Sequence, residues 1–137
     1  MVSIEAVVTA VQAALVADTG AGGVNTLVVG HIYKDYGHDS SVHPQVVHTF
    51  FPGEPWGTFD ADSIDGELQV DVMHHTRRGE DTSARTVAAR VHTLFHRKSI
   101  SITGRSNCAM LSIDQGVPTF DQDLNKIVQR FRLWSSP

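Results

Sequence analysis

Two segments of the chain alternate apolar and polar side chains residue by residue, and this alternation constrains the fold more than any other feature. In residues 67–75 (ELQVDVMHH) the apolar positions share one side, and the other side carries Glu67, Gln69 and Asp71. In residues 125–134 (NKIVQRFRLW) one side carries Ile127, Phe131 and Leu133, and the other carries Lys126, Arg130, Arg132 and Trp134. Because successive side chains of a strand point to opposite faces, both segments are predicted to be strands with one face in the core.

Two other segments follow the helical period. Ser3 is placed to cap a helix that runs to about Asp18, with an apolar stripe formed by Ile4, Val7, Val8, Val11 and Leu15. Asp81, Thr82 or Ser83 can cap a second helix that runs to about Arg97. Its stripe is formed by Val87, Val91, Leu94 and Phe95.

Shorter apolar runs predict four more strands, at residues 26–33, 45–51, 99–103 and 107–114. In the last of these, Ala109, Leu111 and Ile113 fall on one face. The expected order is therefore α-β-β-β-α-β-β-β. This order predicts an α+β fold with a mostly antiparallel β-sheet and two helices packed on one face. A chain of 137 residues without a recognisable linker is expected to form a single domain over residues 1–137.

Composition excludes several classes of protein. The net charge is −4, so no global positive field draws the chain to nucleic acid or to an anionic membrane. Of its 11 basic residues, only Lys34 precedes residue 77. Cys108 is the single cysteine, and no apolar run approaches the roughly 20 residues that span a bilayer. We expect a soluble protein, made in the cytoplasm and without an internal disulfide.

The histidines are the main candidates for chemistry. His74 and His75 are adjacent on a predicted strand, so their rings diverge, and the neighbouring Arg77 and Arg78 would repel a cation. His92 and His96 have the spacing of two zinc ligands on a helix but lack the glutamate of the metalloprotease pattern, and a solvated helix face is the favoured interpretation. Surface positions are likewise the default for His31, His38, His43 and His48.

Other motifs lack the residues or the position in the chain that their function requires. In DADSIDG (residues 60–66), Ile64 and Asp65 occupy the positions that an EF-hand needs for an oxygen ligand and a glycine. The glycine-rich GAGGVN (20–25) follows a helix rather than a strand, the reverse of a phosphate loop. Cys108 resembles an inert thiol more than a nucleophile. We therefore expect no enzyme activity, no cofactor and no metal.

Exposed aromatics and opposite charges then become the candidate interface. The long 52–66 connection offers Trp56, Phe59, Asp60 and Asp62, and the basic residues on other elements are Arg77, Arg78, Lys126, Arg130 and Arg132, with Trp134 beside them. Such an arrangement suits a contact in which the loop of one subunit meets the sheet of its neighbour. In the alternative interpretation, the two loop aromatics complete the core of their own subunit.

The sequence resembles the tail terminator, or tail-completion, proteins of long-tailed bacteriophages. The resemblance spans nearly the whole chain and is carried by four segments: SIEAVVTAVQAALVAD, PQVVHTFF, ELQVDVMHHTRRGEDTSARTVAARVHTLF and NKIVQRFRLW. It rests on pattern and length, because the family has no catalytic signature. The 52–66 loop is longer than expected for the family.

The resemblance implies a homo-oligomer, a hexameric ring that caps the head-proximal end of the tail tube in the virion. The expected partners are the tail tube protein and a head-tail connector or stopper protein, with assembly in the host cytoplasm and no membrane partner. DNA would pass through the ring without specific binding, which agrees with the acidic excess of the chain. Three alternatives stay open: a connector or neck protein of the same particle, a small histidine-dependent metalloenzyme and a small-ligand-binding domain.

Overall fold

A computed structural model describes residues 3–35, 44–53, 66–121 and 124–136. Three helices and six strands follow in the order α1 (Ile4–Ala17), α2 (Val24–Leu27), β1 (Ile32–Lys34), β2 (Gln45–Pro52), β3 (Gly66–His74), α3 (Thr82–Phe95), β4 (Ser106–Asp114), β5 (Thr119–Asp121) and β6 (Leu124–Ser136). The chain forms the predicted α+β architecture. Within the described residues, no helix is long and apolar enough to cross a membrane.

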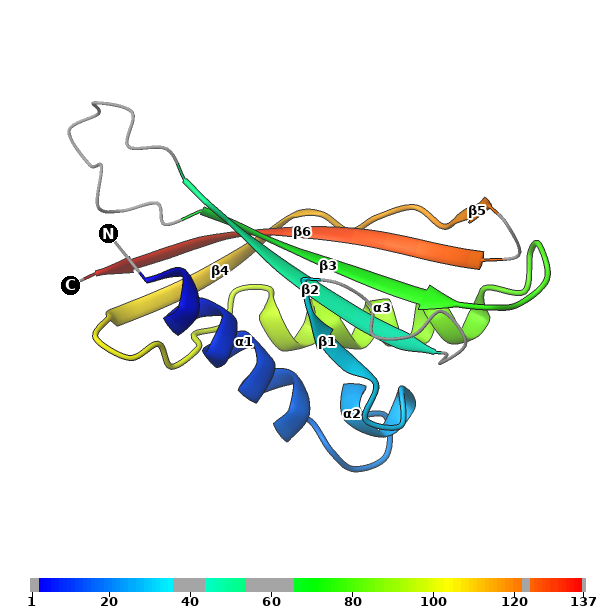
Figure 1. Ribbon diagram of the computed structural model, residues 1–137, viewed down its shortest axis with the longest axis horizontal. Helices are drawn as coiled ribbons and strands as arrows, with labels where there is room; N and C mark the ends of the chain where they lie inside the picture. Colours follow the sequence, from blue (N-terminus) through cyan, green and yellow to red (C-terminus); the bar gives the residue numbers. More distant parts are fainter. Residues whose placement is uncertain (1–2, 36–43, 54–65, 122–123, 137) are drawn as a thin grey trace.

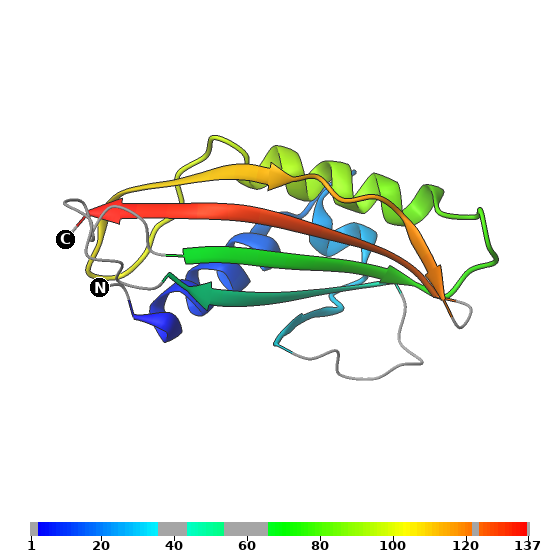
Figure 2. The ribbon, with the colours of Figure 1, turned by 90° about the horizontal axis from the view of Figure 1, so that it is seen from above.

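The strands form one mixed sheet in the order β1-β2-β3-β6-β4, with β5 pairing β6 beyond this path. The β2–β3, β3–β6, β4–β6 and β5–β6 pairs are antiparallel, and only β1–β2 is parallel. All three helices lie on one face of the sheet (Figure 1), and the view from above shows the other face uncovered by any helix (Figure 2). The predicted placement of the helices on one face is confirmed.

The core lies between the helices and the inner sheet face. The predicted stripes of both helices are buried there, except that Ile4 is half exposed and Leu94 is only partly buried. Leu68, Val70, Val72, Phe131 and Leu133 are buried beneath them, as the alternation predicts. In the ion pair that ties α1 to α3, the Asp18 carboxylate accepts Arg90 Nη2 at 2.6 Å and Nε at 2.8 Å.

The predicted strand at residues 26–33 is wrong over most of its length. The Asp18 carboxylate also accepts the Val24 N–H at 2.9 Å, at the first residue of the short helix α2, whose N-cap is Gly23. A Cβ at Gly23 would overlap the Asp18 carbonyl oxygen, so the close approach of these segments requires glycine. Val29 then turns the chain with a φ of 54°, and β1 begins only at Ile32. A tertiary contact at Asp18 therefore overrides the β propensity of the local apolar run.

The predicted strand at residues 99–103 is also wrong. Ile100 and Ile102 are buried as their alternation suggests, but the segment is an irregular loop that covers the core. Immediately before it, Arg97 N–H donates to Met110 C=O at 2.8 Å and Met110 N–H donates to Lys98 C=O at 3.1 Å. Among the described residues, these two hydrogen bonds attach the segment before the loop to the outer edge of β4. The alternating pattern that predicted a strand therefore reflects the burial of Ile100 and Ile102 in a loop.

The face predicted for the segment at 107–114 is reversed. Cys108 and Met110 point into the core, whereas Ala109 is exposed and Ile113 is 40 % exposed. The register of β4 against β6 shifts between Ser106 and Ala109 and again between Ser112 and Asp114. Between these shifts the pairing is regular, and Met110 lies opposite Leu133, so it shares the core face of β6. The pairing partner therefore sets the inward face of β4, and the sequence alternation of the segment does not reveal that partner.

Candidate subunit interface on the open sheet face

The open sheet face is built from the strand positions that alternate away from the core. On β3 and β6 these are the polar positions of the two alternating segments, and the register places Glu67 opposite Arg132 and Gln69 opposite Arg130. On β2 the corresponding row ends at Phe51, which is 51 % exposed and pairs with Glu67. The predicted outward direction of Lys126, Arg130, Arg132 and Trp134 is borne out by the burial pattern of β6.

Two of the three basic residues on β6 pair with carboxylates of the same sheet. Lys126 Nζ lies 3.5 Å from Asp71 Oδ2, and Arg132 Nη2 lies 3.7 Å from Glu67 Oε1. Ion pairs exposed to this degree contribute at most about 1 kcal/mol each to stability. Their main effect is to cancel charge, so the β6 face is less basic than its sequence suggests.

Arg130 differs from its two neighbours. Among the described residues it makes no ion pair, although its register partner on β4 is Asp114. The Asp114 carboxylate instead accepts the Gly116 N–H at 2.8 Å. Arg130, Phe51, Glu67 and Gln69 line an open hollow of about 220 Å³, which we call the sheet hollow.

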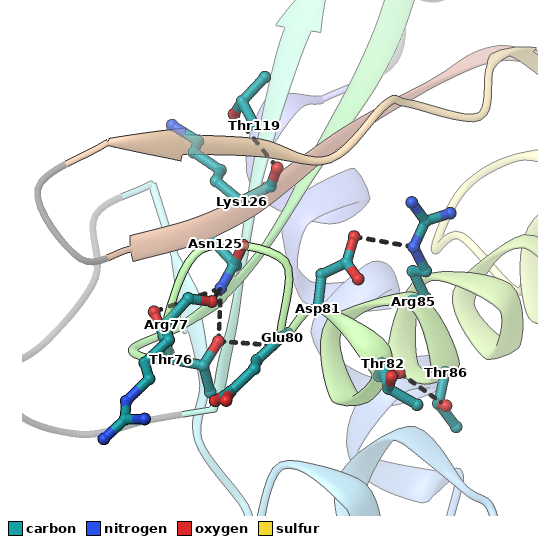
Figure 3. Close-up of polar contacts among 10 residues, drawn as sticks. All are labelled: Thr76, Arg77, Glu80, Asp81, Thr82, Arg85, Thr86, Thr119, Asn125 and Lys126. Atoms are coloured by element: carbon teal, nitrogen blue, oxygen red, sulfur yellow. Dashed lines mark hydrogen bonds and ion pairs between the residues drawn. The ribbon is translucent and has the colours of Figure 1, made fainter.

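The turn that follows β3 carries the other predicted arginines. The buried Asn125 donates its side-chain N–H groups to the carbonyl oxygens of Thr76 and Arg77 at 3.3 and 3.0 Å, and also to the Thr76 hydroxyl. These bonds hold the turn against the start of β6, while the Arg77 side chain extends away from them (Figure 3). The Arg78 guanidinium lies 5.1 Å from the centroid of the Phe120 ring.

Those predicted interface residues that the structure describes do not form one patch. Arg77 and Arg78 lie at the end of the sheet where β3 ends, and Arg130 and Arg132 lie farther along β6. Trp134 is half-buried opposite Ala109 of β4. Trp56, Phe59, Asp60 and Asp62 lie outside the described residues. The prediction missed Phe51 as part of the face, although the outward positions of Glu67 and Gln69 were evident from the alternation.

The histidines do not form a shared site in the described part of the chain. The end of β3 at His74 and the exposure of His75 confirm the strand-end interpretation of this pair. The prediction that His48 lies on the surface is wrong, because its side chain is fully buried and burial lowers its pKa to about 4. Its Nε2 lies 2.6 Å from Gln12 Oε1, across the contact between β2 and α1.

His92 and His96 are partly buried rather than fully solvated. Their rings stack with centroids 4.7 Å apart, and Ser112 N–H donates to His96 Nδ1 at 3.0 Å. Burial, and then the neighbouring His92 and Arg97, lower the pKa of His96. In the neutral ring the remaining proton must therefore sit on Nε2, which leaves no nitrogen lone pair for a metal. No group of three or more His, Cys, Asp or Glu among the residues described could hold a metal ion.

Known proteins resemble the chain both in sequence and in fold. A family model described as "Tail completion protein gp17" matches residues 9–136. A search of curated proteins found no match. A solved chain from the "virion of native gene transfer agent (GTA) particle" is 15 % identical, with a TM-score of 0.72, covering 94 % of this chain and 93 % of that chain. A second solved chain is also 15 % identical, with a TM-score of 0.65 and coverage of 98 % and 96 %. At this identity, the two likenesses establish the fold alone.

Proposed function

The chain belongs to the tail completion protein gp17 family, and from that premise we propose that its copies form a ring at the head-proximal end of a tail tube. The ring ends polymerisation of the tube and offers the surface on which the head joins. Membership of this family makes the chain a structural virion component rather than an enzyme. The fold shared with a chain of a gene transfer agent virion supports a role in a phage-like particle.

The observation that carries the proposal is the open sheet face. A two-layer domain buries one sheet face under its helices, and here the other face presents an exposed Phe51 beside an arginine with no ion-pair partner among the described residues. Protein interfaces are enriched in aromatic residues and arginine at the expense of lysine and glutamate. A face of this composition is suited to contact another protein.

The net charge of the chain supports weak binding to DNA. A ring through which DNA moves must not hold the phosphate backbone tightly, and tight non-specific binding needs several lysine or arginine contacts. The net charge of −4 and the pairing of Lys126 and Arg132 within the subunit both reduce that tendency. We propose that the direct partners are the tail tube protein, a head-tail connector or stopper protein, and further copies of this chain.

Deletion of the gene from the producing phage or prophage tests the role. Electron microscopy should show tails of uncontrolled length and heads without tails, and a plasmid copy of the gene should restore both. A matched control, His75→Gln on the plasmid, should complement fully because His75 is exposed at a strand end. Tails of normal length that fail only to join heads would contradict the terminator role and identify a connector.

A further inference from the structure

We propose that the sheet hollow of one copy receives a carboxylate from residues 54–65 of a second copy, with Arg130 as its ion-pair partner. This inference rests on the proposed ring and names the contact between its neighbouring subunits. It follows from three observations. Arg130 has no ion-pair partner among the described residues, an exposed aromatic ring lies in the hollow beside it, and residues 54–65 are acidic and contain aromatic side chains.

The carboxylates nearest to Arg130 in the sheet register already have partners within the same subunit. Glu67 lies beside Arg132, and Asp71 lies beside Lys126 while also accepting Gln69 Nε2 at 3.1 Å. Asp114 accepts the Gly116 N–H within its own turn. Arg130 is exposed on β6 and forms no ion pair with any described residue, so its guanidinium, which has five N–H donors, is open to an incoming group.

The hollow around Arg130 combines this cation with an exposed ring. Phe51 forms one wall, and Glu67 and Gln69 lie between it and Arg130. An arginine that binds a carboxylate beside an apolar wall makes a stronger ion pair than one in open water, because the wall displaces solvent. The Glu67 carboxylate repels a second anion, but its own pairing with Arg132 offsets that charge. The preferred occupant is therefore an acidic segment that also carries aromatic side chains.

The chain contains one segment of this composition outside the described residues. Residues 54–65 (EPWGTFDADSID) hold four acidic residues, no basic residue, and the aromatics Trp56 and Phe59. The segment joins Gly53 to Gly66, at the end of the sheet where Phe51 and Glu67 lie. A ring of identical subunits requires two different, complementary surfaces on each copy. The acidic segment and the sheet hollow provide such a pair.

Charge exchange between separate chains tests this contact. In Arg130→Glu the hollow repels the acidic segment, and in Asp60→Lys with Asp62→Lys the segment repels the hollow, so each variant alone should associate at least tenfold more weakly than wild type. A mixture of the two should regain assembly. In an alternating ring, the hollow of each Arg130→Glu chain meets a lysine-bearing segment, and each native hollow meets a native segment. Native mass spectrometry should then show oligomers with equal numbers of both chains.

Arg85→Glu is the matched control. Arg85 is an exposed arginine on α3, on the opposite side of the sheet, and its 63 % exposed side chain pairs with Asp81. This variant should assemble as wild type does, and circular dichroism should confirm that all variants are folded. Unchanged assembly of Arg130→Glu would overturn the proposal. So would recovery only when all three substitutions share one chain, since the segment would then occupy the hollow of its own copy.

A disulfide trap gives a readout that does not depend on a stable ring. Gln69→Cys in one chain and Asp62→Cys in another should form a linked dimer under mild oxidation, and the buried Cys108 should stay unreactive. Arg85→Cys mixed with Asp62→Cys should link far less. No excess linking over this control would reject the contact, while a wild-type ring observed in the same preparation would leave the proposed function in place. Absence of any wild-type association with the tube would instead reject the ring itself.

Discussion

The buried His48 shows how one residue couples the sheet to a helix. The Gln12 amide donates through Nε2 to the Ile32 carbonyl at 3.2 Å, so its Oε1 faces the ring and His48 must donate from Nε2. The proton of the neutral ring is thereby fixed, and His48 Nδ1 has no hydrogen-bond partner among the described residues. Protonation would place a buried charge between α1 and β2, which the nearby Asp35 offsets only in part. Burial accordingly lowers the pKa of His48 from 6.5 to about 4.

Acid should therefore destabilise the protein over a defined range. The unfolded state binds more protons than the folded state between the folded pKa of about 4 and the unfolded value of 6.5, so stability falls as pH drops from 7 to 4. The full loss from this residue is about 3 kcal/mol. Urea denaturation of His48→Gln, which keeps a donor toward Gln12 but does not titrate, should show a smaller loss between pH 7 and about 4.5.

The exposed His75 supplies the control for this prediction. His75→Gln should keep the pH dependence of the wild type, because His75 is exposed at the end of β3 and does not separate α1 from the sheet. Parallel stability curves for wild type and His48→Gln would show that another group governs the acid response.

At the scale of elements, the long periodic segments were predictable and the short ones were not. Helices α1 and α3 and strands β3 and β6 each repeat one period over nine or more residues. The predictions for residues 26–33 and 99–103 were wrong because contacts outside each segment determine its backbone. The Asp18 carboxylate fixes the start of α2, and the hydrogen bonds of Met110 fix the chain just before the 99–103 loop. The outward direction of the β6 cations was predictable for the same reason. Their partners were not, since Asp71 lies opposite Val128 and reaches Lys126 only diagonally.

The ion pair between α1 and α3 should contribute measurably to stability. Asp18 is 7 % exposed and Arg90 is 40 % exposed, so solvent screens the pair only partly. The hydrogen bond from Arg90 lowers the pKa of Asp18. Asp18→Asn removes the charge and weakens the cap on α2, and we expect a loss of about 2 kcal/mol in the free energy of unfolding at pH 7.

Asp81→Asn is the matched control for Asp18→Asn. Asp81 pairs with Arg85 at the start of α3, where the arginine side chain is 63 % exposed, and such pairs contribute roughly 0.3–0.5 kcal/mol. Both variants should be measured by urea denaturation at pH 7 and again at pH 3. Because the folded pKa of Asp18 is lowered, its contribution should diminish in acid as the carboxylate is protonated. Equal losses for the two variants at pH 7 would contradict a special role for Asp18.

For the whole molecule, the single open sheet face predicts self-association that depends on concentration. Native mass spectrometry over a dilution series should show a hexamer in exchange with monomer, without a dominant dimer. Higher ionic strength should shift the population toward monomer, because Arg130 is exposed to screening ions. A dimer that persists at every concentration would indicate a two-fold interface, and two-fold contacts do not by themselves close a six-membered ring.

The edge of the sheet at β4 has a consequence for how such copies meet. Residues 97 and 98 occupy the outward backbone groups of Met110, and the His96 ring takes the N–H of Ser112. An incoming strand therefore finds no free backbone N–H or C=O group at these positions, which disfavours association of copies through this edge. A β-sheet that continued from one copy into the next through this edge would need these groups, and they are already bonded within their own chain.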